Sequence, residues 1–279
     1  MLESHAVVPV WIDLTFRRRS SLPTRVKQRL TVSLPEGLPV GPKVTDTSKS
    51  VEVAPNAARV IAPPLRGKRW VAIVGAHRRA LQPVNGRLEL SQRFAVDFSA
   101  QLDRSGVSGR GNPSRNSSYF NYGQPLLAVG DGTVVAAVDR YPDQIPNAPE
   151  PVSLAAADGN HVIIRLARGV YAAYAHIKPG TVRVRPGQRI KAGQVLGRLG
   201  NSGATTGPHL HFQLMSRPSL LDADGLPFVV DRFRFDGRAP SLEAFIDADR
   251  EGTPVLFDRS GAGDRRDQGF TGLDVVSFR

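Results

Sequence analysis

Two histidines, His209 and His211, stand two positions apart in residues 207–212, which read Gly-Pro-His-Leu-His-Phe. In a β-strand, residues i and i+2 project from the same face, so both imidazole rings would meet in one small volume. Such a pair can supply a metal ligand and a catalytic neighbour, because imidazole binds zinc and exchanges protons near neutral pH. Two surface histidines on an edge strand would have the same spacing, so the spacing alone leaves both interpretations open.

The amino-acid composition limits the chemistry that is open to this chain. It has 279 residues and no Cys. The absence of Cys excludes a disulfide scaffold, a Cys-ligated metal site and thiol catalysis. A metal ion would therefore need His and carboxylate ligands.

The chain is strongly basic, with 37 Lys and Arg against 25 Asp and Glu and a formal net charge of +12. This charge favours an anionic partner, and an anionic cell-wall polymer is one candidate. The basic residues are scattered without the interleaved aromatic residues of an RNA-binding sheet, so we expect no nucleic-acid partner. No apolar run approaches the roughly 18 residues of a membrane helix. The N-terminus does not have the pattern of a signal peptide, so either the chain is cytosolic or its export signal lies outside this sequence.

Short alternating segments separated by glycine and proline predict a mainly antiparallel all-β fold. The chain has 27 Gly and 22 Pro, and a short helical pattern is found only at residues 241–246. We expect the principal strands at residues 70–75, 88–97, 125–128, 132–138, 161–166, 170–176, 190–199, 209–215, 228–235 and 275–278.

The distribution of these segments predicts three regions. Residues 1–68 are expected to form a β-sandwich-like accessory region, with a strand near residues 10–16 and another near residues 30–34. Residues 69–219 are expected to form the catalytic core, and residues 220–279 an extension packed on it. We expect residues 103–118 to form a long surface loop that could bind a ligand. The charged, Gly-rich residues 260–268 are expected to fray.

Three segments resemble a known enzyme family. Residues 193–212 resemble the closing motif of the M23 zinc metallopeptidases, the LytM-like or lysostaphin-like peptidoglycan hydrolases. The stretch Tyr174-Ala175-His176-Ile177 resembles their Tyr-x-His-Leu strand, and residues 122–135 resemble their first β-hairpin. The three motifs follow in family order, and the resemblance implies an all-β, LytM-like core of the duplicated hybrid type.

The resemblance also implies roles for individual residues. Such enzymes hold zinc with a His-x-x-x-Asp pair and the second His of His-x-His, and two further histidines flank the bound water. On this pattern Asp97 and His211 are expected zinc ligands of one ion per chain, and His209 and His176 are the expected catalytic histidines. Zinc lowers the pKa of its water to roughly 7, while the histidines take up a proton and stabilise the oxyanion.

The chain departs from the family at the first zinc ligand. That position lies four residues before the aspartate and is occupied by Arg93, whose guanidinium carries no lone pair for a metal. If residues 88–97 form a strand, Arg93 and Asp97 share one face. Three accounts stay open: His77 supplies the missing ligand, Gln92 or an extra water completes a weaker site, or the site is metal-free and Arg93 pairs with Asp97.

Further polar side chains stand near these motifs in the sequence. Asn121, Tyr174 and Asn201 are expected to contact the substrate, although Asn in Gly-rich loops mostly forms turns. His161 is expected to line the wall of the groove.

The leading hypothesis is a zinc-dependent endopeptidase that cleaves peptide bonds of bacterial peptidoglycan, located by family analogy in the envelope or secreted. The alternative is a degenerate, metal-free module that binds wall peptides or regulates a partner hydrolase, and Arg93 is the feature that supports it. A phosphocarrier domain with two facing histidines is a third interpretation, which the motifs match less well. A biotinyl or lipoyl carrier built on Lys191 is weaker, because the flanking Met is missing.

Overall fold

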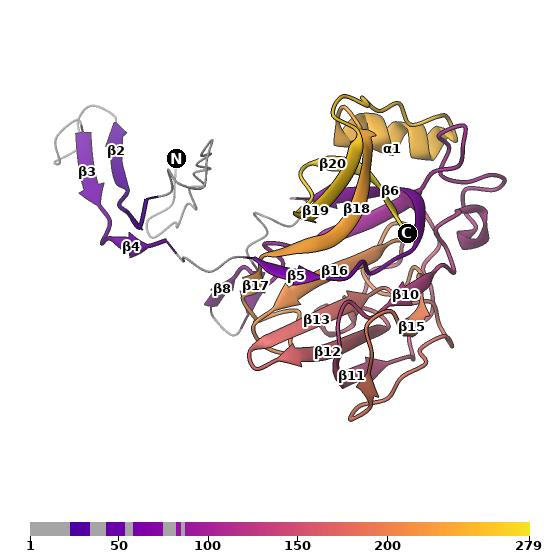
Figure 1. Ribbon diagram of the computed structural model, residues 1–279, viewed down its shortest axis with the longest axis horizontal. Helices are drawn as coiled ribbons and strands as arrows, with labels where there is room; N and C mark the ends of the chain where they lie inside the picture. Colours follow the sequence, from indigo (N-terminus) through magenta and orange to yellow (C-terminus); the bar gives the residue numbers. More distant parts are fainter. Residues whose placement is uncertain (1–22, 34–42, 54–57, 75–81, 85–86) are drawn as a thin grey trace. The chain divides into compact units, whose positions relative to one another are not determined.

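The structure is a computed structural model that describes residues 23–33, 43–53, 58–74, 82–84 and 87–279 (Figure 1). The chain divides into two compact units, residues 1–57 and residues 58–279. Within the described ranges, no helix combines the length and the apolar character that crossing a membrane requires.

The first unit contains two small antiparallel strand pairs. Strand β1 (Arg25–Val26) pairs with β4 (Val51–Glu52), and β2 (Arg29–Ser33) pairs with β3 (Lys43–Thr47). The strand predicted from the alternation near residues 30–34 is therefore confirmed as β2. The strand predicted near residues 10–16 lies outside the described residues.

The second unit is built on a twelve-stranded sheet, and this confirms the predicted all-β class. Its order is β14-β11-β12-β13-β16-β9-β6-β20-β18-β19, with β17 beside β16 and β5 beside β18. Its pairs are antiparallel except for β5 with β18. Two further pairs, β7 with β8 and β10 with β15, lie outside this sheet. The strand bounds are β5 (Arg59–Ile61), β6 (Gly67–Val74), β7 (Gln82–Val84), β8 (Arg87–Glu89), β9 (Val96–Gln101), β10 (Pro125–Leu127), β11 (Gly132–Val138), β12 (His161–Ala167), β13 (Val170–Ala175), β14 (Arg189–Ile190), β15 (Val195–Arg198), β16 (Leu210–Met215), β17 (Gly225–Leu226), β18 (Phe228–Arg238), β19 (Gly263–Gln268) and β20 (Leu273–Phe278).

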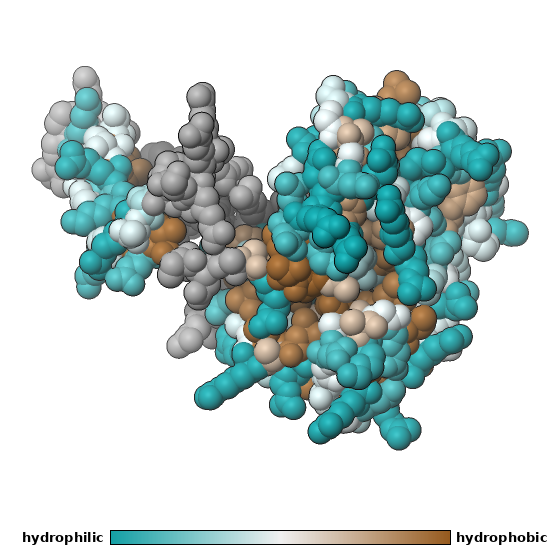
Figure 2. Space-filling view, in the orientation of Figure 1, coloured by the Kyte–Doolittle hydropathy of each residue, from teal (hydrophilic) through white to brown (hydrophobic). Residues whose placement is uncertain are grey.

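Strand β16 carries apolar core residues on one face and polar side chains on the other. All six of its residues are buried. Leu210, Phe212 and Leu214 pack into the main apolar core, which also contains Trp70 and Tyr174. Because side chains alternate along a strand, His211 and Gln213 project from the opposite face. On the face drawn in Figure 2, hydrophobic atoms come to the surface around β5 and β13, and hydrophilic ones cover β18 and β19.

Three predicted segments differ from the structure. The strand expected over residues 190–199 is divided by a turn at residues 192–193 into β14 and β15. The strand expected over residues 88–97 is interrupted by a turn at residues 91–94, and β9 begins only at Val96. The turn is held by backbone bonds from Arg93 N–H to Leu90 C=O and from Ala95 N–H to Gln92 C=O, at 3.1 and 3.0 Å. Residues 263–268, expected to fray, form β19 instead. This strand pairs with β18 and leaves most of its side chains in solvent, so it lacks the apolar alternation that identifies buried strands.

The helix expected at residues 241–246 is confirmed and is longer, α1 (Leu242–Glu251). Its N-terminus is capped by the Ser241 hydroxyl, which accepts a bond from Ala244 N–H at 3.0 Å. Gly252 ends the helix in the left-handed conformation, at a φ of 66°. Phe245 and Ala248 are buried against Val71 and Val275 of the sheet.

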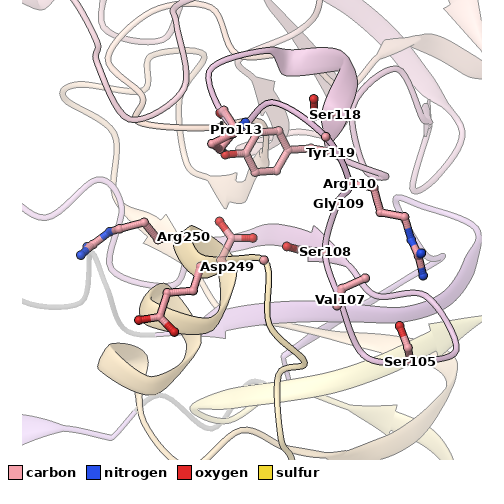
Figure 3. A pocket seen from close by; sticks show the side chains of 13 residues that line it. Ser105, Val107, Ser108, Gly109, Arg110, Pro113, Ser118, Tyr119, Asp249 and Arg250 are labelled. Atoms are coloured by element: carbon pink, nitrogen blue, oxygen red, sulfur yellow. Dashed lines mark hydrogen bonds between the residues drawn. The ribbon is translucent and has the colours of Figure 1, made fainter.

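A cavity of about 650 Å³ lies between α1 and the loop at residues 105–119 (Figure 3). Asp249 of α1 points into it beside Ser108, whose hydroxyl donates a hydrogen bond to the carboxylate. The Oδ1 atom of Asp249 is buried and has no hydrogen-bond partner among the described residues. Burial raises the pKa of Asp249 above its ordinary value of 3.8, and the Ser108 bond opposes this only in part.

Asp249→Asn is expected to stabilise the fold at neutral and alkaline pH. Because the pKa of Asp249 is raised on folding, the folded state binds the proton more tightly, and the ionised carboxylate costs stability as the pH rises above 4. The melting temperature of the variant should exceed that of the wild type at pH 8 by about 2–4 °C for each kcal/mol gained, and the two should converge near pH 4.

The matched control is Asp247→Asn on the same helix, because that side chain is 54% exposed and lies 3.9 Å from Arg250. It should change the melting temperature little at either pH. A lower melting temperature of Asp249→Asn at pH 8 would show that the charge of Asp249 is stabilising.

Candidate active site

The pairing of β9 with β16 places Asp97 directly opposite His211. Strand β13 lies on the other side of β16, where Ala175 is opposite His211, and His176 follows it in the chain. His209 precedes β16 and forms a bridge with Gly200. Three neighbouring strands therefore bring together the four side chains that the family pattern selects.

The contact between Asp97 and His211 is short and buried. Asp97 Oδ1 lies 3.0 Å from His211 Nδ1, and the two side chains are 12% and 5% exposed. The other ring nitrogen, His211 Nε2, lies 3.0 Å from Gln213 Oε1. Gln213 donates its amide N–H to the backbone carbonyl of Ser91 at 3.2 Å, so its oxygen faces the ring. The proton of a neutral His211 is therefore held on Nε2.

This tautomer leaves the lone pair of His211 Nδ1 facing a carboxylate oxygen. Two acceptors at 3.0 Å repel one another unless a proton or a metal cation lies between them. Burial by itself lowers the pKa of His211, but the hydrogen bond and charge of Asp97, together with Gln213, outweigh it and raise the pKa above its ordinary value. The pair is thus built to hold a positive charge.

His176 is held as a neutral imidazole. Its Nδ1–H donates to the carbonyl of Ser202 at 2.8 Å, so the lone pair is on Nε2. Burial, followed by repulsion from His209 and His211, lowers the pKa of His176 well below its ordinary value. Its backbone has a φ of 61°, a conformation that a residue with a side chain adopts only when its surroundings impose it.

Two glycines allow the loops behind His176 to cross closely. A Cβ on Gly159 would lie 2.2 Å from the carbonyl oxygen of Ser202, and one on Gly203 would lie 2.4 Å from the backbone nitrogen of Gly159. Both glycines have positive φ, of 56° and 91°. Glycine is the residue that fits here, and the crossing fixes the carbonyl that orients His176.

His209 stacks on His176 at a tilt, with ring centroids 4.6 Å apart. Its Nδ1–H donates to the carbonyl of Gly207 at 2.9 Å, and the Thr205 hydroxyl lies 3.1 Å from the same nitrogen. Its Nε2 atom lies 3.9 Å from Asp97 Oδ1. The lone pair of His209 is therefore directed to the same side as the Asp97 carboxylate.

The four side chains line a hollow of about 620 Å³. Gln92 and Asp158 also line it, together with residues 149–152 and 204–206. Burial raises the pKa of Asp158, and the charges of His161 and His211 oppose this shift. His161, which was expected at the wall of the groove, is not among the lining residues.

Arg93 does not occupy the position that its spacing predicts. It lies in the turn before β9, is exposed, and places its guanidinium 5.3 Å from the centre of the Phe94 ring. Among the ion pairs of the described residues, none joins Arg93 to Asp97. Its predicted position beside Asp97 is therefore wrong, because the turn removes it from the strand face.

The three expected substrate contacts lie beneath the hollow and do not line it. Tyr174, Asn121 and Asn201 are all fully buried. The Tyr174 hydroxyl accepts a bond from Val129 N–H at 2.9 Å. Asn121 donates to the backbone carbonyls of Ser99 and Pro208. Asn201 donates to the backbone carbonyl of Gln144 and to Asn116 Oδ1. Their burial does not support contact with a substrate, because the two amide N–H groups and the Tyr174 hydroxyl are bonded to the loops around the site.

The described residues bring together two of the expected metal ligands, Asp97 and His211. Within the described residues, no group of three or more His, Asp or Glu side chains is arranged around a point that could hold a metal ion. His77, the proposed replacement ligand, lies outside the described residues. Gln92 stays as the candidate that the structure places at the hollow.

The sequence interpretation missed several supporting groups. Gln213 could have been found, because it lies two residues after His211 and so shares its strand face. Ser202 and Gly207 act through backbone carbonyls, which leave no signature in side-chain type. Asp158 stands in a loop with no recognisable motif.

Comparison with known proteins gives the region a family. Residues 118–223 match the model described as Peptidase family M23; this segment contains His176, His209 and His211 and begins after Asp97. The chain is 33% identical over 110 residues to the peptidoglycan DD-endopeptidase ShyC of Vibrio cholerae, covering 39% of this chain and 22% of that protein. It is 34% identical over 113 residues to the glycyl-glycine endopeptidase ALE-1 of Staphylococcus capitis, covering 40% of this chain and 26% of that protein. The matches thus span about a quarter of these relatives.

A solved structure gives a weaker likeness. The catalytic domain of lysostaphin from Staphylococcus simulans is 25% identical and aligns with 52% of this chain and 80% of that chain, at a TM-score of 0.32. At this score the structural alignment adds nothing to the sequence match. The sequence match shows that residues 118–223, which contain three of the four side chains of the histidine cluster, are similar to peptidase family M23.

Proposed function

We propose that this chain is a zinc-dependent endopeptidase that hydrolyses peptide bonds of bacterial peptidoglycan. The observation that carries the proposal is the buried contact of Asp97 with His211, whose fixed tautomer turns a lone pair toward a carboxylate oxygen. The family match and the wall-peptide endopeptidases among the relatives support the substrate class. We propose the cell wall as its place of action on the same grounds.

The donor set fits a zinc ion in its chemistry. Zinc takes neutral imidazole nitrogens and carboxylate oxygens, and the imidazoles that bind it usually donate their other N–H to a carbonyl or carboxylate. Asp97 and His211 would hold the ion, with Gln213 as the outer partner of His211. A third protein ligand is expected from Gln92 or His77. When bound, zinc would lower the pKa of its water and polarise the scissile carbonyl.

The chain's own residues then supply the proton transfers. His176 is neutral, and with Nδ1–H held by Ser202 its Nε2 can accept a proton from an attacking water. His209 has its Nε2 atom on the side of Asp97 and, once protonated there, can donate to the oxyanion or the leaving amine. Both rings are oriented by backbone carbonyls, so they need little rearrangement during the reaction.

The runner-up is a metal-free module that binds wall peptides or regulates a partner hydrolase. It is favoured by the sequence, which has Arg93 where the family pattern has its first histidine, and by the lack of a three-ligand group within the described residues. In that case a proton would lie between Asp97 and His211. The two functions predict different metal contents.

The purified, dialysed protein is expected to contain about one zinc per chain, and His211→Ala should lose it, because a site with one ligand fewer binds far more weakly. Elemental analysis measures both. His161→Ala is the matched control, since His161 does not line the hollow, and it should keep the metal. No zinc in the wild type, even after zinc is added back, would reject the peptidase and leave the metal-free module.

Gln213→Met is expected to weaken zinc binding by about 10–100-fold, the usual effect of losing an outer partner of a metal-bound histidine. Methionine keeps the length of the side chain but loses the amide oxygen that accepts from His211 Nε2–H. Gln213→Glu keeps an acceptor and should retain most of the affinity. Competition with a chromogenic chelator gives the constants, and equal affinity in Gln213→Met and the wild type would contradict this role.

His176→Gln is expected to lower the rate of peptidoglycan hydrolysis by about 10²–10⁴-fold while leaving the zinc content unchanged, because it removes a proton acceptor. Release of soluble peptides from purified peptidoglycan measures the rate. His161→Gln serves as the control with normal activity. Hydrolysis by His176→Gln at the wild-type rate would exclude His176 from the reaction.

A further inference from the structure

Cationic side chains gather around strands β18 and β19 and the end of β20. Eight of them line two adjoining hollows of about 380 and 440 Å³, against three carboxylates, Asp231, Asp236 and Asp264. Figure 2 shows strongly hydrophilic side chains over this part of the sheet. We call these eight residues the arginine patch: Lys68, Arg69, Arg232, Arg234, Arg259, Arg265, Arg266 and Arg279.

Two arginines of the patch face one another across the strand pair. Arg232 of β18 is directly opposite Arg266 of β19 in the register, so their side chains rise from the same face. Like charges directly opposite on neighbouring strands destabilise the pair. Both residues are exposed, and neither belongs to an ion pair in the described part of the chain. The sheet therefore keeps a repulsion that an anion would relieve.

The carboxylates of the patch neutralise only part of its charge. Asp264 lies 3.9 Å from Arg234 and 3.4 Å from Arg279, and Asp236 lies 3.3 Å from Arg234. The two pairs of Asp264 are exposed and weak, whereas Asp236 is mostly buried; at least half of each arginine side chain stays accessible. They orient Arg234 and Arg279 without using up their charge.

The two hollows favour an elongated ligand. Arg234 and Arg279 line both of them, so the two hollows offer adjoining positions for anionic groups. Guanidinium groups bind phosphate in a bidentate manner, and arginine is the residue best suited to it. A chain of linked phosphates would occupy both hollows, whereas a single anion would fill one.

The aromatic residues of the region argue against nucleic acid. Single strands are bound by stacking bases on free aromatic faces. Here the ring of Phe257 is covered by the guanidinium of Arg259 at 5.2 Å, and that of Phe235 by those of Arg238 and Arg265 at 5.9 and 5.3 Å. We propose that the arginine patch is a binding site for a linear phosphate-bearing polyanion without bases, separate from the histidine site.

The test is a titration of end-labelled linear polyphosphate with the full chain at several salt concentrations. The wild type should bind with an affinity that falls as salt rises. Arg232→Gln/Arg266→Gln should bind at least tenfold more weakly, with a salt slope reduced by about 1.4–1.8 because two phosphate contacts are lost. The matched control is Arg185→Gln/Arg189→Gln, which removes two exposed arginines elsewhere and leaves the same net charge. It should bind within about twofold of the wild type.

Three results would overturn the proposal. Equal losses in both double variants would show that net charge alone is responsible. Displacement by monomeric phosphate at the same phosphate concentration would show a site for a single anion. Tighter binding of single-stranded DNA or of anionic lipid vesicles than of polyphosphate would assign the patch to a different partner.

The weaker binding expected of Arg232→Gln/Arg266→Gln is not explained by a loss of folding. Removing the facing Arg232–Arg266 pair should keep or raise the melting temperature at low salt, since a like-charge contact is lost. Hydrolysis of a soluble peptide by Arg232→Gln/Arg266→Gln should equal that of the wild type. A failure of the patch is therefore distinguishable from a failure of the proposed peptidase.

Discussion

The central constraint in this structure is a buried imidazole whose lone pair faces a carboxylate at 3.0 Å. Neither side chain can turn away. His211 is tied by its other nitrogen to Gln213, which is tied in turn to the backbone at Ser91. Asp97 is placed opposite His211 by the register of β9 and β16. The sheet has therefore fixed two electron-rich groups together, and this arrangement is stable only with a positive charge between them.

The surroundings follow from that constraint. A cation between Asp97 and His211 requires the neighbouring imidazoles to stay neutral, and the low pKa of His176 satisfies this. Backbone carbonyls at Ser202 and Gly207 decide which nitrogen of each flanking ring carries the proton. The Ser202 carbonyl lies where two loops cross too closely for any side chain at Gly159 or Gly203. Gly159 and Gly203 thus contribute indirectly to the protonation of His176, because they allow the crossing that positions the carbonyl to which it donates.

Much of this arrangement could be predicted from the sequence. The alternating segments identified the strands of the sheet, and the spacing of His209 and His211 placed both at one end of β16. The turn before β9 was missed because Ser91, Gln92 and Arg93 include no glycine or proline to mark it. Strand β19 was missed because it is charged and exposed, so apolar alternation could not reveal it. The boundaries at residues 68 and 219 stay predictions.

The missed turn also explains why the sequence did not identify the first metal ligand. Alignment by spacing carries Arg93 into the position of a histidine only if the chain runs as a continuous strand, and the turn at residues 91–94 breaks that assumption. Within β9 and β16, the alternation of the strand fixes the face from which each side chain projects, whereas a turn imposes no such alternation. The ligands on strands are therefore readable from sequence, and the ligand before the strand is not.

The sheet also sets the relation between the two proposed sites. Strands β6 and β20 separate β9 from β18, and β19 lies beyond β18. At about 4.8 Å per strand, β9 and β19 lie roughly 20 Å apart across one continuous sheet. A polymer anchored in the same wall as the peptide substrate would be held at that distance from the histidines. Binding at the arginine patch would then raise the local concentration of cleavable peptide without any change in the chemistry at Asp97 and His211.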